Sequence, residues 1–198
     1  ITKEQQELLL KHTRKLGCWL ISDEVYHQIT FNGLAAPSFL KFSKPNDRLI
    51  VINSASKSFD MTGWRIGWIT HPEELGEHIA KLVQITTTGV PEFLQIGFIA
   101  ALQNYKNITN DLRQRLKKSR DMMFDKLSTW NQVECSIPEA AFYAFFKVKG
   151  MDNSLEFAKK LIVETNVGVA PGIAFGESGE GHLRICFAAK EKFIQEIM

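Results

Sequence analysis

The sequence predicts an α/β fold in two parts, and three observations support this prediction. Over residues 1–115, short apolar runs alternate with helical patterns, which is typical of a mainly parallel sheet covered by helices. Beyond a long charged helical pattern, strands of alternating polarity predict a small α+β domain over residues 116–198. The chain has 198 residues and is 44% hydrophobic, which is enough for one good core or two modest ones.

The first expected element is a helix that ends at Gly17. Thr2 and Gln5 have the spacing of a capping box, in which each side chain accepts a hydrogen bond from the other residue's backbone N–H. Gly17 follows the last apolar position of the helical stripe. Glycine at such a place adopts the left-handed conformation that closes a helix.

Three short strands should follow this helix. They are expected over residues 18–21, 49–52 and 65–70, and a further helix should begin near Pro72. Because a crossover segment separates one strand from the next, we expect the strands to pair in parallel.

The remaining elements alternate between helical and strand patterns. An apolar helix over residues 91–104 follows a proline, and the longest helical pattern, residues 108–130, contains the expected domain boundary. Strands over 133–138 and 141–148 should pair as antiparallel neighbours. The other expected elements are a helix over 154–165, strands over 167–170 and 183–188, and a final helix over 191–198.

Composition argues against several classes of partner. The formal net charge of +2 is too small, and the Lys and Arg residues too scattered, to indicate nucleic-acid binding. No apolar stretch has the length of a membrane span, and the five histidines show no metal-ligand spacing. Cys18 and Cys186 lie in apolar strand-like runs, and Cys135 has no partner by spacing. The cysteines therefore predict buried thiols in a reducing compartment, the cytoplasm.

Lys57 is the strongest candidate for chemistry. It follows the apolar run 49–52, at the place where loops gather at the edge of an open α/β sheet. A second cation, Arg65, favours an uncharged amine that can attack a carbonyl. Ser54, Ser56 and the Arg65 fork suit a phosphate group. A lysine that forms a Schiff base beside a phosphate site indicates pyridoxal phosphate as the cofactor.

Asp23 is expected on the same edge of the sheet as Lys57, because each follows a strand of a parallel pair. A buried carboxylate there can keep a pyridine nitrogen protonated, which makes the ring an electron sink. Tyr26 is placed to present its hydroxyl to the oxygen of the same ring. Taken by itself, Asp23 is equally consistent with an exposed acidic turn.

Six motifs occur along the chain in one order. They are Asp23-Glu24-Val25-Tyr26, Ser54-x-x-Lys57-x-Phe59, Gly63-x-Arg65-x-Gly67-Trp68, Pro138-Glu139-Ala140-Ala141-Phe142-Tyr143, Val169-Ala170-Pro171-Gly172-x-x-Phe175-Gly176 and His182-Leu183-Arg184-Ile185-Cys186-Phe187-Ala188. Together they resemble the fold-type I, class I/II aminotransferases of the aspartate aminotransferase group. The resemblance implies the C-terminal half of such an enzyme, with the second half of its large domain and a small α+β C-terminal domain. The start at Ile1 and the end within a helical pattern also favour a piece of a longer polypeptide.

The resemblance implies a role for each candidate side chain in moving an amino group between an L-amino acid and a 2-oxo acid. Lys57 would carry the cofactor and move the proton of the substrate α-carbon. Asp23 would pair with the pyridinium nitrogen, and Tyr26 with the ring oxygen. The cofactor phosphate would be held by three further residues, namely Ser54, Arg65 and Ser56.

Arg184 would bind the substrate α-carboxylate as a bidentate fork. Considered alone, Arg184 could instead be a strand-edge arginine, and Arg65 a surface ion-pair partner. The resemblance further implies a homodimer, because the site of this family lies at the subunit interface.

Two other functions are compatible with the same residues. A carbon–sulfur β-lyase or a ring-forming enzyme would keep the cofactor and change the reaction, whereas the effector domain of a transcription regulator would keep only the fold. The motif Gly63-Trp64-Arg65-x-Gly67-Trp68 favours transamination. One departure from the family concerns Ala140 and Ala141, which fill a place where glycine is common. A turn that needs a positive φ would resist alanine there.

Overall fold

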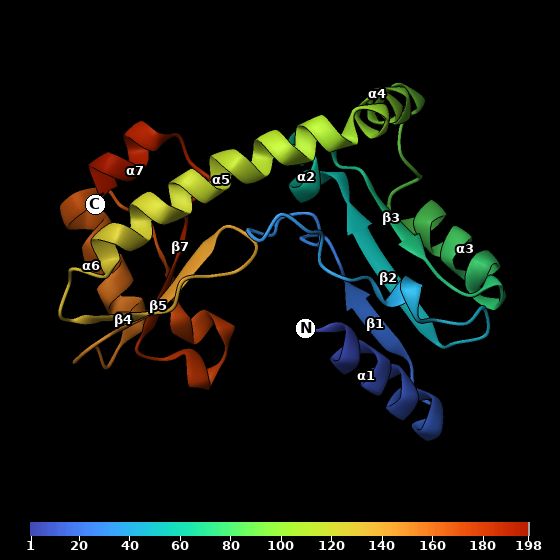
Figure 1. The fold of residues 1–198 in the computed structure, drawn as a ribbon, viewed down its shortest axis with the longest axis horizontal. Coiled ribbons are helices and arrows are strands. Elements are labelled where there is room, and N and C mark those ends of the chain that lie inside the picture. Colours follow the sequence, from blue (N-terminus) through green and yellow to red (C-terminus); the bar gives the residue numbers. More distant parts are fainter. Residues whose placement is uncertain (198) are drawn as a thin grey trace. The chain divides into compact units, whose positions relative to one another are not determined.

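The computed structural model describes residues 1–197, and its chain divides into two compact units (Figure 1). The division falls after Leu112, within helix α5 (Tyr105–Leu127). The sequence placed the boundary in the same helical stretch, after residue 115. That the first unit belongs to a cofactor-binding domain and the second is a small C-terminal domain stays a prediction.

Helix α1 (Lys3–Leu16) has the ends that the sequence predicts. The Thr2 backbone N–H donates to Gln5 Oε1 at 2.7 Å, and the Gln5 N–H donates to Thr2 Oγ1 at 3.3 Å. Gly17 closes the helix in the left-handed conformation, with φ of 66°. Leu10 on this helix is buried against Leu49 and Val51, so α1 covers one face of the first sheet.

The first sheet has the order β1 (Leu20–Asp23), β2 (Leu49–Ser54), β3 (Gly67–Thr70). The first two strands pair in parallel, as expected, but β3 pairs with β2 in the antiparallel sense, so the parallel prediction for the third strand is wrong. The reason lies in the path of the connection over residues 55–66. The Ala55 N–H donates to the Ile66 carbonyl at 3.0 Å, so the chain reverses at the end of β2 instead of crossing the sheet.

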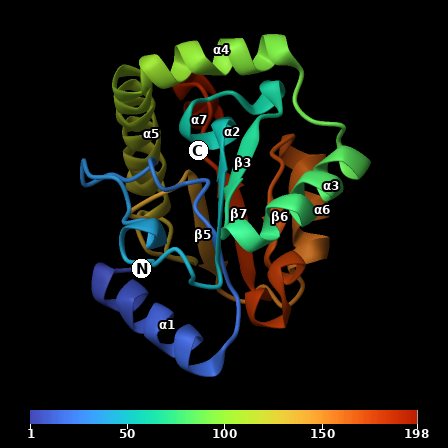
Figure 2. The same ribbon diagram turned by 90° about the vertical axis from the view of Figure 1, so that its right-hand side faces the viewer.

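The first unit also contains the helices α3 (Gly76–Thr86) and α4 (Glu92–Gln103). A 3₁₀ turn over Glu73–Leu75 precedes α3, so the α-helix begins later than the expected start near Pro72. Ile79 and Val83 of α3 line a pocket with Ile52 of β2. Because side chains alternate along β2, this contact puts α3 on the opposite face of the sheet from α1 (Figure 2).

The second unit contains a four-stranded antiparallel sheet. Its strands, in spatial order, are β4 (Val133–Cys135), β5 (Tyr143–Val148), β7 (His182–Cys186) and β6 (Ala170–Pro171), and its helices are α6 (Ser154–Thr165) and α7 (Glu191–Ile197). The antiparallel pairing of the strands predicted at 133–138 and 141–148 is confirmed, as is the helix over 154–165. The strand expected over 167–170 is shorter, since only Ala170 and Pro171 pair with β7.

Alternation along β5 and β7 gives this sheet two different faces. Ala144, Phe146, Leu183 and Ile185 are buried. Phe146 and Ile185 line one cavity together with Leu127 of α5, so this face forms the core beneath the long helix. The side chains between them on each strand, among them Arg184, belong to the other face.

The predicted burial of two cysteine thiols is wrong. Cys18 and Cys186 are exposed, and Cys135 is half-buried, where burial raises the pKa of its thiol. Cys18 precedes the first residue of β1, so it lies outside the strand that was expected to bury it. Cys186 ends β7 on the same face as Arg184, opposite the buried Leu183 and Ile185.

The alanine pair at 140 and 141 does contain a left-handed residue. Ala141 has φ of 64°, whereas the φ of Ala140 is not positive. A non-glycine residue in this conformation costs about 1–2 kcal/mol because its Cβ approaches the following carbonyl oxygen. The turn into β5 therefore holds local backbone strain at Ala141.

Within residues 1–197, no helix has both the length and the apolar character needed to cross a bilayer.

We expect Ala141→Gly to stabilise the protein by up to about 1 kcal/mol, because the relieved strain exceeds the added entropy of the unfolded chain. Ala140→Gly is the matched control, and it should destabilise the protein by about 0.5–1 kcal/mol. Thermal unfolding of the two variants should therefore shift in opposite directions. A lower melting temperature for both would contradict this account of the turn.

The ion pair of Arg14 and Asp47 connects α1 to the loop before β2. Arg14 donates through Nε to Asp47 Oδ1 at 2.7 Å and through Nη2 to Oδ2 at 2.6 Å, and the Lys44 N–H donates to the same carboxylate at 2.7 Å. The hydrogen bonds from Arg14 outweigh the burial of the carboxyl and hold the pKa of Asp47 below its ordinary value of 3.8. The pair therefore stabilises the fold above about pH 3.8, and the contribution is lost as the pH falls through the lowered pKa.

Asp47→Asn should cost about 1–3 kcal/mol of unfolding free energy at neutral pH, since charge-assisted hydrogen bonds to a buried carboxylate are lost. Glu164→Gln, which removes an exposed ion pair to Lys160, is the control and should cost less than about 0.5 kcal/mol. Denaturant unfolding at pH 7 and pH 3 checks the sign. The difference between wild type and Asp47→Asn should shrink on acidification, and a constant difference would count against the carboxylate's role.

Candidate active site

Lys57 lies in α2 (Ala55–Ser58), the short helix that directly follows β2. The Ser54 hydroxyl caps this helix by accepting the Ser56 N–H at 3.0 Å, and it donates to the Ile66 carbonyl at 3.2 Å. Both the turn into α2 and the return of the chain toward β3 are thus tied to one serine. The Lys57 side chain is half-buried there.

The parallel pairing of β1 and β2 places Asp23 and Lys57 at the same edge of the sheet. Asp23 ends β1 and lies opposite Ile52, and Lys57 follows the end of β2. A hydrogen bond from the Ser58 hydroxyl to the Val25 carbonyl, 3.0 Å long, joins α2 to the segment after β1. The two candidate segments are therefore in direct contact.

The buried carboxylate at this edge belongs to Glu24 and not to Asp23, which corrects the expectation of a buried Asp23. Glu24 Oε1 accepts the Phe39 N–H at 3.0 Å and the Ser22 hydroxyl at 3.2 Å, so it organises the loop behind the sheet edge. Asp23 is exposed and accepts the Val25 N–H at 3.2 Å. Strand alternation explains the difference, because consecutive residues point to opposite faces. Tyr26 is half-buried in the turn that follows.

Arg65 is held in the left-handed conformation at the end of a 3₁₀ turn, with φ of 54°. Its Nη1 donates to the Thr62 carbonyl at 3.2 Å, and its side chain is exposed. Strained non-glycine backbone of this kind is concentrated at functional sites. Arg65 and Gly67 line a pocket of about 560 Å³ over β2 and β3. Gly67 is required there, since a Cβ at this position would lie 2.9 Å from the Asn53 carbonyl oxygen.

Trp64 has a positioning role that the sequence did not identify. A Cβ at Gly97 of α4 would collide with the Trp64 ring, so the ring rests directly on the helix backbone. The Trp64 side chain is 40% exposed. Its packing on Gly97 anchors the turn that presents Arg65. The spacing between a tryptophan and a distant glycine carries no signal of such a contact.

Arg184 lies on β7 in the second unit and is half-buried. Its guanidinium carbon is 4.4 Å from the ring centroid of Tyr143 and 4.3 Å from that of Phe175. Both contacts have the geometry of a cation–π interaction. The two aromatic residues occur in the sequence motifs, but nothing in their spacing indicated contact with Arg184.

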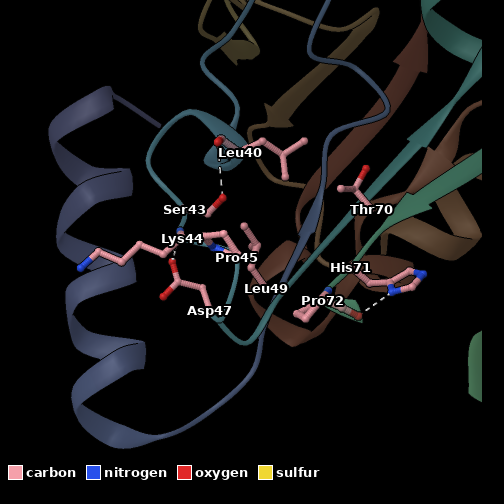
Figure 3. Close-up of a pocket in the computed structure, with 9 residues that line it drawn as sticks. All are labelled: Leu40, Ser43, Lys44, Pro45, Asp47, Leu49, Thr70, His71 and Pro72. Carbon is pink, nitrogen blue, oxygen red and sulfur yellow. Dashed lines mark hydrogen bonds between the residues drawn. The ribbon is translucent and has the colours of Figure 1, made fainter. Parts of the chain in front are cut away.

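Another pocket of the first unit lies at the far end of β2 (Figure 3). It has a volume of about 260 Å³ and includes Leu49, the first residue of β2, and Thr70, the last residue of β3. Asp47 and His71 also line it, and His71 Nδ1 donates to the Pro72 carbonyl at 2.8 Å. Because Lys57 follows the opposite end of β2, this pocket is separate from the candidate active site.

Among the described residues, no group of three or more His, Cys, Asp or Glu side chains is arranged to hold a metal ion. The candidate residues offer the Lys57 amine, the Asp23 carboxylate, serine hydroxyl groups and the Arg65 guanidinium. This donor set is suited to a phosphorylated carbonyl compound, with the amine for the carbonyl carbon and the cation for the phosphate.

Comparison with known proteins gives consistent matches over the whole chain. The sequence profile of the family "Aminotransferase class I and II" matches residues 1–197. The putative aminotransferase YugH of Bacillus subtilis is 30% identical over 202 residues, covering 100% of this chain and 51% of that protein. The chain thus spans about half the length of the curated relatives it matches.

Solved structures agree with the sequence matches. The aromatic aminotransferase from Pyrococcus horikoshii has a TM-score of 0.91 at 28% identity, with all of this chain and 53% of that chain covered. The aspartate aminotransferase from Thermus thermophilus with maleate has a TM-score of 0.88 at 26% identity, with 98% and 50% covered. The α/β fold is therefore that of the aminotransferase structures. The chain belongs to the class I and II aminotransferase family.

Proposed function

We propose that this chain is the C-terminal half of a pyridoxal-phosphate-dependent aminotransferase, which moves an amino group between an L-amino acid and a 2-oxo acid. The observation that carries the proposal is the contact between the segments of Lys57 and Asp23 at the carboxyl edge of β1 and β2. The family match over the whole chain supports the same reaction class. In this proposal the first unit is part of the large cofactor-binding domain, and the second is the small domain.

The residues at the sheet edge fit pyridoxal phosphate. Arg65 and Ser56 would hold its phosphate, and the Ser54 hydroxyl would join them by exchanging its bond to the Ile66 carbonyl. Asp23 is exposed at this edge, so its carboxylate is accessible to a ring nitrogen. Tyr26 would donate to the ring oxygen. When bound, this cofactor supplies an electron-withdrawing ring that stabilises negative charge on the α-carbon of the amino acid.

The side chains of this chain then have three tasks. The Lys57 amine would attach the cofactor covalently and, once the substrate amine has displaced it, would act as the base that takes the proton from the substrate α-carbon. Asp23 would stabilise a positive charge on the ring nitrogen by pairing with it. Arg184 binds the substrate α-carboxylate through two parallel N–H···O bonds, which a lysine cannot form. The Thermus thermophilus relative was solved with maleate, a dicarboxylate, which supports a carboxylate as the group that Arg184 binds.

A homodimer and a cytoplasmic location complete the proposal. The homodimer follows from the family resemblance, and the cytoplasm from three free cysteines that suit a reducing compartment. The amino-acid substrates follow from relatives such as the aspartate aminotransferase of Pyrococcus horikoshii.

Lys57→Ala in the complete polypeptide should abolish covalent attachment of pyridoxal phosphate and lower turnover by at least ~10²-fold, since the proposed proton-transfer base is removed. Borohydride reduction followed by peptide mass mapping should locate the pyridoxyl group on Lys57 in the wild type and nowhere in the variant. Lys81→Ala, at an exposed lysine of α3, is the control and should keep the adduct. An adduct that persists in Lys57→Ala would refute the assignment.

Gly97→Ala should weaken cofactor binding, because the added methyl group displaces the Trp64 ring and with it the turn that presents Arg65. Overpacking of this kind costs about 1–3 kcal/mol of stability. Gly76→Ala is the matched control, since its Cβ would meet only ordinary contacts, the nearest being 3.9 Å from His71. Titration with pyridoxal phosphate should give a higher Kd for Gly97→Ala alone. Equal cofactor affinity in both variants would show that the Trp64 ring does not position the phosphate site.

A further inference from the structure

The face of the second sheet opposite the core carries a connected set of aromatic and basic side chains. Phe145 on β5 lies directly opposite Arg184 on β7, and Tyr143 lies opposite Cys186. Tyr143 is thus the diagonal neighbour of Arg184, within reach of a long side chain. On the same face, the rings of Phe145 and His182 are stacked, with centroids 4.9 Å apart and planes 4° from parallel.

Two rings reach the Arg184 guanidinium from the two sides of β7. Tyr143 belongs to β5, which flanks β7 on one side, and Phe175 belongs to the turn that follows β6 on the other side. Their centroids are 4.4 Å and 4.3 Å from the guanidinium carbon. Phe175 is itself supported by Phe145, whose ring meets it edge-on at a centroid distance of 5.9 Å.

The turn that carries Phe175 is fixed by backbone contacts. A Cβ at Gly172 would collide with the Gly179 carbonyl oxygen, and a Cβ at Gly179 would collide with the carbonyl oxygen of Gly172. The Ile173 N–H donates to the Ser154 hydroxyl at 3.2 Å, which ties the turn to the start of α6. Phe175 is therefore held on a rigid support.

Glu180 strengthens the same support. Its Oε1 accepts the Ser154 N–H at 2.7 Å and the Gly181 N–H at 2.9 Å. Hydrogen bonding with Ser154 and Gly181 keeps the pKa of Glu180 below its usual value. The carboxylate is thus ionised at neutral pH, and its two hydrogen bonds connect the first residue of α6 to the residue before β7.

Within the described part of the second unit, the Arg184 guanidinium has ring contacts but no hydrogen bond or ion pair to another residue. A guanidinium carries five N–H donors, which favour an acceptor with two parallel oxygens. The two rings pack against the faces of the guanidinium plane and leave its N–H edge available for such an acceptor.

We infer that Tyr143 and Phe175 are positioning residues for substrate binding, which hold Arg184 between two aromatic rings so that its donor edge is preset for a carboxylate. This inference rests on the proposed role of Arg184. Fixing the side chain before binding removes the entropy cost of ordering it when the substrate arrives. The rings act through Arg184 and need no contact with the substrate.

Maleate binding to the cofactor-loaded complete enzyme, measured by calorimetry, tests the inference. Tyr143→Leu and Phe175→Leu keep apolar bulk and remove the ring, so each should raise the Kd for maleate by about 3- to 30-fold, the equivalent of one cation–π contact. Tyr143→Phe and Phe175→Tyr keep a ring and should leave the Kd close to that of the wild type.

A double-variant cycle shows whether the rings act through Arg184. In an Arg184→Gln background, adding Phe175→Leu should cause no further loss of maleate affinity. A general structural effect of Phe175→Leu would instead lower affinity in both backgrounds, and that result would overturn the inference.

A spectroscopic measurement needs no substitution in the rings. In wild-type protein with labelled arginine, the side-chain protons of Arg184 should show upfield ring-current shifts, and Arg184→Gln identifies the signals. Their absence would overturn the inference even if a ring variant failed to fold.

Failure of the inference can be told apart from failure of the proposed function. If Arg184→Gln loses maleate affinity while both leucine variants keep it, Arg184 binds the carboxylate without help from the rings, and the inference alone is wrong. If Arg184→Gln itself keeps full affinity, the proposed carboxylate role is wrong, and the inference falls with it.

Discussion

The parallel pairing of β1 with β2 is the constraint on which the candidate active site depends. It brings the carboxyl ends of both strands to one edge, so that Asp23 and the helix of Lys57 lie together although they are far apart in the sequence. The bond from Ser58 to the Val25 carbonyl then fixes this arrangement at the backbone. A slip of one residue in either strand would turn its side chains to the other face and separate the two groups.

Close backbone approaches keep both sets of functional side chains in place. In the first unit, Gly67 lets β3 approach β2 closely, and Gly97 leaves room for the ring of Trp64, the residue before Arg65, to pack on α4. In the second unit, Gly172 and Gly179 cross so closely that neither position has room for a Cβ, and this crossing supports Phe175. The glycines touch no substrate in the proposal, yet they decide where the two arginines can lie.

Much of the fold follows from local patterns. The capping box of Thr2 and Gln5, the closing glycine at Gly17 and the helix over 154–165 depend on residues close in sequence, and the structure confirms them. The direction of β3 was not predictable in this way, because a short connection of 55–66 serves either a crossover or a reversal. In the structure, the hydrogen bond from the Ala55 N–H to the Ile66 carbonyl stabilises the reversal.

The sequence by itself determined the residue types of the site: an amine after a strand, a carboxylate after its neighbour, and arginine forks suited to anions. Only the tertiary structure decided which carboxylate is buried, Glu24 and not Asp23, and which thiols are exposed. It alone brought Tyr143 and Phe175 to Arg184. The chemistry that a side chain can perform depends on its residue type alone. Its burial and its contacts depend on strand register and on close approaches between distant backbone segments.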